Sequence, residues 1–145
     1  MPIVTCPKCN TANRVPPEKE GLHGKCGRCA HQLPAFNLGQ VFELNDRDFA
    51  SFLADYRDLL ILVDFYSQTC GPCHAIAPVI ARLPDKFGPR LAVGKLDTVL
   101  NPITAGKFHI QGVPTLLFFR NTLKIDAIVG APPAEALYQR IRQLL

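Results

Sequence analysis

The chain of 145 residues is long enough for one ordinary domain with a small module attached. Hydrophobic residues make up 48% of it and charged residues 19%, a balance that supports a packed core and excludes a wholly disordered chain. The formal net charge is +4, and residues 1–36 hold five Lys or Arg against two Glu, which are too few and too scattered to indicate a nucleic-acid-binding surface.

The first residues, MPIVTCPKCN, lack the basic and apolar regions of a signal peptide. The densest apolar run, at 59–63, is far shorter than the about 18 residues that a membrane-spanning helix needs. We therefore expect no membrane association and a cytoplasmic location, where thiols stay reduced. Six cysteines in three Cys-x-x-Cys pairs then indicate metal binding or redox chemistry more than a framework of structural disulfides.

The first two pairs are spaced C-x2-C-x16-C-x2-C within residues 1–36. This spacing is typical of zinc ribbons, in which two tight turns converge on one tetrahedral ion. The segment has almost no hydrophobic periodicity, so it needs a metal to become ordered. We expect one structural Zn²⁺ per chain, with the ligands Cys6, Cys9, Cys26 and Cys29. Two local disulfides or four free thiols are the alternatives, and His23 and His31 are not needed because four cysteines complete such a site.

From residue 40 onward the hydrophobic pattern is that of a globular domain, after a linker of sequence AFNLGQ. Alternating or continuously apolar runs predict strands at 40–44, 59–67, 91–98, 115–119 and 124–129. Helical periodicity predicts helices at 45–58, 70–88, 101–110 and 132–145. The predicted order is β-α-β-α-β-α-β-β-α, an α/β domain around a mixed sheet. We expect two domains, at 1–36 and 37–145.

Residues Cys70 and Cys73 form the third pair, which differs from the other two. It follows a buried strand and opens a helix, whose N-terminus stabilises a thiolate and should lower the pKa of Cys70. Pro72 lacks the N–H that a metal-binding turn directs at its sulfurs, and it fits a first helical turn. No further pair remains to complete a four-sulfur site. The pattern favours a redox-active dithiol over a metal site or a purely structural pair.

Several segments resemble thioredoxins in order and at matching separations: LVDFYSQTCGPCHAIAP, GKLD, NPITAGKFHIQGVPTLLFF and VGA. The resemblance covers about residues 40–145. In one bacterial subtype of that family, a four-cysteine zinc module precedes the thioredoxin domain. The resemblance implies a thioredoxin fold, with a mixed central sheet flanked by helices, after a small zinc-ribbon domain.

The resemblance also implies a role for each matching residue. Cys70 matches the attacking thiolate and Cys73 the resolving thiol. Asp64 matches a buried carboxylate that helps to deprotonate the resolving cysteine through water; a strand-end acid facing solvent is the alternative, which its apolar neighbours argue against. Lys95 matches a lysine that neighbours this carboxylate, and an ordinary surface lysine is the alternative.

The proline of GVPT, Pro114, matches the family's cis-proline, which lies beside the active disulfide and exposes backbone to a substrate strand. The residues expected to line the substrate groove are Thr69, Gly71, Pro72, Gly112, Val113 and Gly130. For Gly112 and Gly130, simple turn geometry is the alternative explanation.

Four positions depart from the family pattern. The chain has Tyr66 and Thr69 where tryptophan is usual, and it contains no tryptophan at all. His74 stands where lysine or arginine is usual, and Thr122 replaces a turn glycine. None of these changes removes a reacting atom. Thr69 and His74 lie at the expected rim of the site, so they leave the reduction potential and the choice of partners open.

The implied activity is that of a protein-disulfide reductase, which performs dithiol–disulfide exchange through Cys70 and Cys73 and needs no bound cofactor for that chemistry. The expected partners are disulfide-containing proteins and an NADPH-dependent thioredoxin reductase, with no nucleic acid or membrane, and the chain is expected to be a monomer. The alternative is an adaptor, in which the zinc ribbon recruits a partner and the thioredoxin scaffold turns over little.

Overall fold

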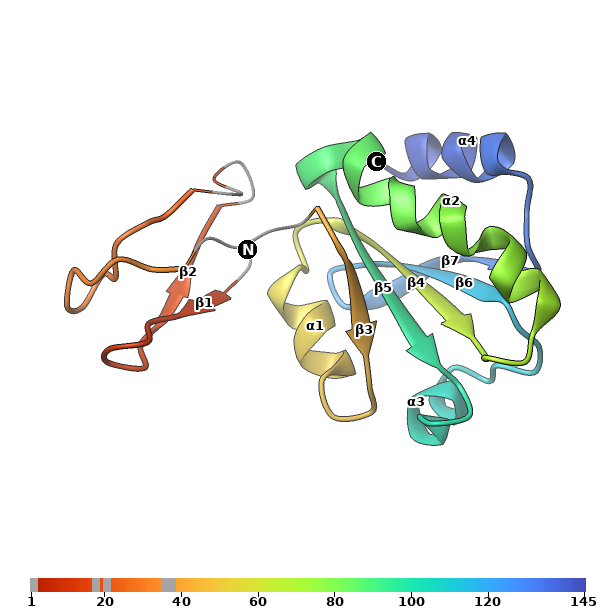
Figure 1. The fold of residues 1–145 in the computed structure, drawn as a ribbon, viewed down its shortest axis with the longest axis horizontal. Helices are drawn as coiled ribbons and strands as arrows, with labels where there is room; N and C mark the ends of the chain where they lie inside the picture. Colours follow the sequence, from red (N-terminus) through yellow and green to blue (C-terminus); the bar gives the residue numbers. More distant parts are fainter. Residues whose placement is uncertain (1–2, 17–18, 20–21, 35–38) are drawn as a thin grey trace.

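The computed structural model describes residues 3–16, 19, 22–34 and 39–145, which form two separate sheets (Figure 1). In the small N-terminal sheet, β1 (Ile3–Thr5) pairs antiparallel with β2 (Ala12–Arg14). The larger sheet belongs to the remainder of the chain. The predicted boundary between the two domains, at residues 36 and 37, lies outside the described residues.

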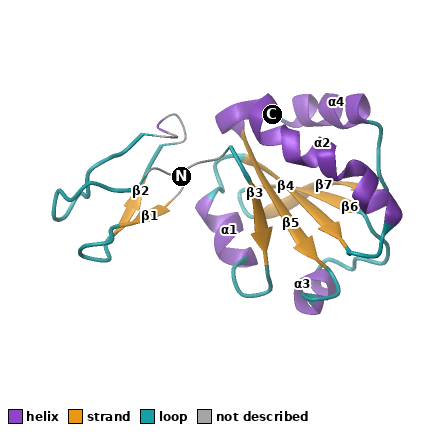
Figure 2. Cartoon of the chain, in the orientation of Figure 1, coloured by secondary structure: helices purple, strands orange, loops and turns teal. Residues whose placement is uncertain are grey.

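The large sheet has the strand order β3-β5-β4-β6-β7 (Figure 2). Its strands are β3 (Val41–Leu44), β4 (Leu60–Tyr66), β5 (Leu91–Asp97), β6 (Thr115–Arg120) and β7 (Leu123–Val129). The β3, β5 and β4 strands run parallel, whereas β6 is antiparallel to β4 and β7 to β6. The predicted mixed sheet is therefore confirmed.

Four helices alternate with these strands in the predicted order. They are α1 (Phe49–Asp55), α2 (Gly71–Phe87), α3 (Pro102–Lys107) and α4 (Ala134–Leu144), with a short 3-10 helix at Gly88–Arg90 after α2. Helix α1 begins at Phe49, later than the predicted residue 45. The Asn45 side chain accepts hydrogen bonds from the backbone N–H groups of Arg47 and Asp48, and these bonds form a turn before the helix.

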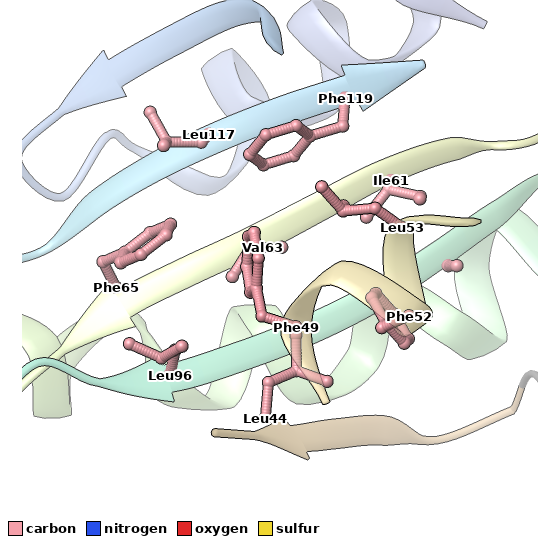
Figure 3. Close-up of a cluster of buried hydrophobic side chains, with 11 residues drawn as sticks. Leu44, Phe49, Phe52, Leu53, Ile61, Val63, Phe65, Leu96, Leu117 and Phe119 are labelled. Atoms are coloured by element: carbon pink, nitrogen blue, oxygen red, sulfur yellow. The ribbon is translucent and has the colours of Figure 1, made fainter. Parts of the chain in front are cut away.

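Helices α2 and α4 cover one face of the sheet and α1 and α3 the other (Figure 1). On the α1 face, aromatic rings dominate the core, among them Phe49, Phe65 and Phe119 (Figure 3). On the α2 face the core is mainly aliphatic. Because successive side chains of β4 point to opposite faces of the sheet, every second one faces α2, and Asp64 is one of these.

One glycine is required by the packing of β3 against β5. A Cβ on Gly94 would come within 2.6 Å of Leu44 Cδ1, closer than side chains approach each other. Leu44 is 4% exposed, so its side chain has little room to move. Gly94 therefore permits the edge strand to lie flat against its neighbour.

No helix among the described residues combines the length and the apolar composition needed to cross a membrane.

Candidate active site and metal site

The redox pair lies at the N-terminus of α2, directly after the loop that follows β4. Cys70 is the N-cap residue of the helix and forms a disulfide with Cys73. The backbone N–H of Cys73 donates to Cys70 Sγ at 3.1 Å, so the sulfur takes the place of a capping oxygen. Cys70 is half-buried while Cys73 is buried. Only Cys70 of the pair is therefore open to a second protein.

A second loop faces the disulfide from the start of β6. The Val113–Pro114 peptide is cis, and the Val113 carbonyl oxygen lies 3.5 Å from Cys70 Sγ. The backbone N–H of Gly130 donates to the Pro114 carbonyl oxygen at 2.8 Å. Gly130 has φ +94°, which side chains rarely adopt, so a glycine suits this position. Of the residues expected in the groove, Val113 thus contacts the sulfur of Cys70, and Gly130 is bonded to the cis-proline that follows Val113.

The remaining expected groove residues belong to the helix start. Thr69, Gly71 and Pro72 are all exposed, beside the half-buried Cys70. Gly112 is also exposed, and its carbonyl oxygen accepts a hydrogen bond from the Thr115 hydroxyl at 2.6 Å. An incoming chain therefore meets backbone and small side chains around Cys70.

Behind the disulfide, Asp64 is a buried carboxyl in the middle of β4. It is 4% exposed, and its Oδ1 has no hydrogen-bond partner. Burial raises the pKa of Asp64 to about 6, the positive charge of Lys95 lowers it, and the negative charge of Glu43 raises it. A carboxyl with a pKa near neutrality can accept and return a proton under physiological conditions.

A cavity of about 160 Å³ lies between the Asp64 carboxyl and Cys73. Its wall includes Asp64, Tyr66, Gln68, Cys73, His74 and Lys95. The volume is ample for water molecules between a thiol and a carboxylate. The resemblance to thioredoxins implied that Asp64, Cys73 and Lys95 are neighbours, whereas no sequence signal pointed to Gln68.

The loop before Cys70 is held by polar contacts that sequence reasoning missed. His74 Nε2 donates to the Gln68 carbonyl oxygen at 2.7 Å, and Gln68 Nε2 donates to Asp97 Oδ2 at 3.4 Å. Asp97 is buried, and its other oxygen accepts the backbone N–H groups of Val99 and Leu100. These bonds tie the active-site loop to the end of β5, a link that only the parallel pairing of β4 with β5 makes possible.

In the N-terminal part, four cysteine sulfurs converge on one point. All of them lie within 4.8 Å of one another, and the Cys6–Cys29 and Cys9–Cys26 pairs of sulfurs are each 3.6 Å apart. Four thiolates bound at about 2.3 Å around a tetrahedral zinc would be about 3.8 Å apart. The donor set and its spacing therefore fit a zinc ion and indicate metal binding.

The two cysteine turns have the same backbone design. The Asn10 N–H donates to the Cys6 carbonyl, and the Ala30 N–H to that of Cys26, both at 2.9 Å. Asn10 and Ala30 both have positive φ, near 60°. Backbone N–H groups, first that of Cys29 and then that of Arg28, lower the pKa of Cys26 to about 6. The backbone of the second turn thus favours the thiolate form of Cys26.

Asn13 holds the two cysteine turns together. Its Oδ1 accepts the Gly27 N–H at 2.9 Å, while its Nδ2 donates to the Thr11 carbonyl at 3.0 Å and lies 3.6 Å from Cys26 Sγ. No signal in a single sequence distinguishes Asn13 from other polar residues of the loop.

The two histidines of this part of the chain are not among the potential metal ligands. His23 Nδ1 lies 2.9 Å from the Leu33 carbonyl oxygen, and the described group of potential ligands consists of the four cysteines without His23 or His31.

Comparison with known proteins places this geometry in a family. Residues 40–143 match the thioredoxin family profile. The chain belongs to the thioredoxin family. Residues 5–31 match a second profile, described as thioredoxin 2, N-terminal, a zinc ribbon. The thioredoxin fold after a zinc-ribbon hairpin, as predicted, is therefore confirmed.

Curated thioredoxins show the same relationship over different lengths. Thioredoxin C-3 of Corynebacterium nephridii is 34% identical over 143 residues, covering 99% of this chain and 95% of that protein. Thioredoxin of Synechocystis sp. is 38% identical over 98 residues, covering 66% of this chain and 92% of the relative. Thioredoxin of Bacillus subtilis is 37% identical over 95 residues, covering 66% and 91%.

As a thioredoxin, the protein is a dithiol–disulfide oxidoreductase, and Cys70 and Cys73 are its active-site pair. Its substrates are disulfide-containing proteins, on which the family acts as a protein-disulfide reductase. Of the two functions that the sequence left open, the enzyme is thus supported over the adaptor.

Proposed function

We propose that Cys70 and Cys73 divide the reaction between them according to their exposure. The Cys70 thiolate attacks one sulfur of a substrate disulfide, a mixed disulfide forms, and the other substrate sulfur leaves as a thiolate. Cys73 then attacks Cys70 Sγ, so that the Cys70–Cys73 disulfide forms and the second substrate thiolate leaves. Two electrons pass to the substrate, whose thiolates take up protons from solvent.

In this proposal Asp64 accepts the proton of Cys73 during the second step. The carboxylate becomes a carboxylic acid, and the Cys73 thiolate is the nucleophile that resolves the mixed disulfide. The observation that supports this role is the buried Asp64 with an unpaired Oδ1, beside the cavity that Cys73 also lines. Water in that cavity would carry the proton, because both groups border it.

The experiment follows each step separately in the Asp64→Asn variant. A mixed disulfide between Cys70 and a small aromatic thiol is formed, and release of the thiol is recorded over a range of pH. We expect release at pH 7 to slow by at least about tenfold, within the usual contribution of a general base, while attack by reduced Cys70 on a fresh disulfide changes little. Unchanged release in a folded variant would remove Asp64 from the proton transfer.

We further propose that the cis-Pro114 loop and the helix start form the substrate groove. An extended substrate segment would pair with backbone beside Val113, and Thr69, Gly71, Pro72, Gly112 and Gly130 would border it. An NADPH-dependent thioredoxin reductase in the cytoplasm would return electrons to the Cys70–Cys73 disulfide. Insulin reduction with dithiothreitol, and its loss in Cys70→Ser, measures this turnover.

For the front segment we propose one structural Zn²⁺ per chain, held by Cys6, Cys9, Cys26 and Cys29. When bound, the ion supplies four strong bonds that order the two cysteine turns. Metal analysis of protein purified under reducing conditions tests the stoichiometry, and a value well below one zinc per chain would contradict it.

We also propose that the chain has two domains, at residues 1–36 and 37–145, and that it is a monomer in solution.

A further inference from the structure

Three charged side chains form one row across the α2 face of the sheet. Glu43 of β3 is the register partner of Lys95 in β5, and Lys95 is in turn the partner of Asp64 in β4. Side chains of register partners point to the same face and lie next to each other. Lys95 therefore has two neighbouring carboxyl groups, one buried at the centre of the sheet and one at its edge.

The contacts of Lys95 favour the edge. Lys95 Nζ lies 3.6 Å from Glu43 Oε2 and 5.5 Å from the centre of the Tyr66 ring. The Tyr66 hydroxyl donates a hydrogen bond to the other oxygen, Glu43 Oε1. Among the described residues, no ion pair within 4.0 Å joins Lys95 to Asp64, and Asp64 Oδ1 has no hydrogen-bond partner. The ammonium therefore forms its ion pair with Glu43 and not with Asp64, although its positive charge still lowers the pKa of Asp64.

This arrangement matters for the strength of Asp64 as a base. A carboxylate that gains a close ammonium partner has a lower pKa and gives up its proton more readily. The groups facing Asp64 are Glu43 from β3, Lys95 from β5, Tyr66 from its own strand, and Cys73 and His74 from α2. Of these groups, Glu43 and Lys95 form the ion pair, and the Lys95 ammonium can change its position relative to Glu43.

We propose that Glu43 is a positioning residue for the transfer of the proton between Cys73 and Asp64: with Tyr66 it holds the Lys95 ammonium at the outer side of the cavity and keeps Asp64 unpaired. This inference rests on the proposed role of Asp64. It assigns a function to an exposed acid of the edge strand, which touches neither cysteine. Tyr66, in a position where tryptophan is usual in thioredoxins, supplies the hydroxyl that fixes Glu43.

The test replaces Glu43 by glutamine in the full-length protein. The titration of the Asp64 carboxyl is followed by carbon NMR, and release from the Cys70 mixed disulfide is recorded against pH. With Glu43 neutral, Lys95 is free to approach Asp64. A close opposite charge lowers a carboxyl pKa by about 1–3 units. The midpoint of the Asp64 titration and the midpoint of the pH profile of thiol release should therefore both move to lower pH by about one unit. Tyr66→Phe should move them in the same direction by less.

Two controls separate this effect from a general loss of charge. Glu135→Gln breaks a comparable surface ion pair, with Arg142 at 3.3 Å on α4, and should leave both midpoints in place. In a Lys95→Met background, Glu43→Gln should cause less than half of its shift, because the residue acts through the ammonium. A full shift in that background would mean that Glu43 acts directly through space and would overturn the positioning role.

The outcome for this inference is distinguishable from the outcome for Asp64 itself. An Asp64 titration in Glu43→Gln identical to that of the parent overturns the inference, whatever the rates show. If Asp64→Asn releases the mixed disulfide at the parental rate, the proton-acceptor role fails, while the NMR titration of Asp64 in Glu43→Gln still decides whether Glu43 positions Lys95.

Discussion

The N-terminal zinc ribbon (residues 1–36, called the ribbon below) and the thioredoxin domain of this chain differ in what can hold them folded. In the ribbon, the buried cluster among the described residues consists of Val4, Cys6, Cys26 and Leu33, so two of its four members belong to the four-cysteine cluster. In the thioredoxin domain, two extensive clusters of hydrophobic side chains lie on the two faces of one sheet. Burial at about 25 cal/mol per Å² can therefore stabilise the second region but not the first.

The difference teaches where each region is sensitive to its surroundings. A ribbon ordered by metal–thiolate bonds depends on free metal, pH and the redox state of its cysteines. A sheet ordered by apolar burial does not, except where a polar group has been buried for chemistry, as Asp64 has. Perturbations of the metal and of single polar residues should thus act on one region and spare the other.

Metal removal is the largest expected effect. Chelation of the metal should unfold the ribbon, because metal binding to such sites contributes on the order of 10 kcal/mol of folding free energy. Amide hydrogen exchange should then lose protection in residues 3–16 and 22–34 and keep it in β4 and β5. Insulin reduction by Cys70 should persist.

A truncated chain that begins near residue 38 is the matched control and should show the same activity and the same unfolding midpoint for the sheet. A fall of the sheet's midpoint on chelation would show that the two regions stabilise each other. Cys6→Ser should reproduce the effect of the chelator.

The second effect concerns the one buried carboxyl that lies beside the disulfide. Asp64 has a folded-state pKa of about 6, above the ordinary value of 3.8. Its cost to stability is absent well below pH 3.8, where both states are protonated, small at pH 4, and nearly complete above pH 6, where it amounts to about 3 kcal/mol. Asp64→Asn should therefore stabilise the sheet at pH 8 and do little at pH 4, as measured by urea unfolding.

The Asp126→Asn variant is the control for Asp64→Asn, because the Asp126 carboxylate forms an ion pair with Arg140 at 2.7 Å. That replacement removes a favourable contact and should not stabilise at either pH. If the gain in stability from Asp64→Asn were the same at both pH values, ionisation of the buried Asp64 carboxyl would not be what lowers the free energy of unfolding.

A third effect, on recognition, is expected from Thr69→Trp. Thr69 is exposed beside Cys70, and a tryptophan would add apolar contact surface for a partner. About 50 Å² of extra burial corresponds to roughly tenfold in affinity. KM for a thioredoxin reductase should fall accordingly, with a smaller change in kcat. Ala50→Trp, on an exposed position of α1, should leave KM unchanged; equal effects of the two would show that position 69 has no special part in recognition.

The smallest effect is expected in the β6–β7 hairpin. Its two connecting residues, Asn121 and Thr122, have φ of 53° and 68°, a region that suits glycine and that asparagine tolerates better than a β-branched residue. Thr122→Gly should stabilise the domain by about 1 kcal/mol, and Asn121→Gly by less. Urea unfolding measures both, and a destabilised Thr122→Gly variant would contradict the strain.

Much of the fold was predictable because its signals are local. The apolar run around Val63 predicts a buried strand, and Cys70 beside Pro72 predicts a helix start, since both follow from periodicity and N-terminal chemistry. The helix expected to extend to residue 110 ends at Lys107, because His109 takes a left-handed φ of 54° that no residue-level preference required.

The parts of the site that could not be predicted depend on strand order. Glu43 and Lys95 are far apart in the chain and meet because β5 lies between β3 and β4. Likewise Gln68 meets Asp97 only through the pairing of β4 with β5. Periodicity tells which face a side chain occupies, but it does not tell which strand is its neighbour.

The position of β3 has a consequence for synthesis of the protein. During translation, β3 emerges early, but Val41 pairs with Val93, about fifty residues later, and within the described residues β3 has no other strand as neighbour. The four cysteines have all been synthesised by residue 29, and the bonds of the second turn need only residues 30 and 31 in addition, so the proposed metal site can form early. We therefore expect nascent chains to acquire a metal-bound ribbon first, while β3 and the aromatic face of α1 stay without their neighbours until β5 has left the ribosome.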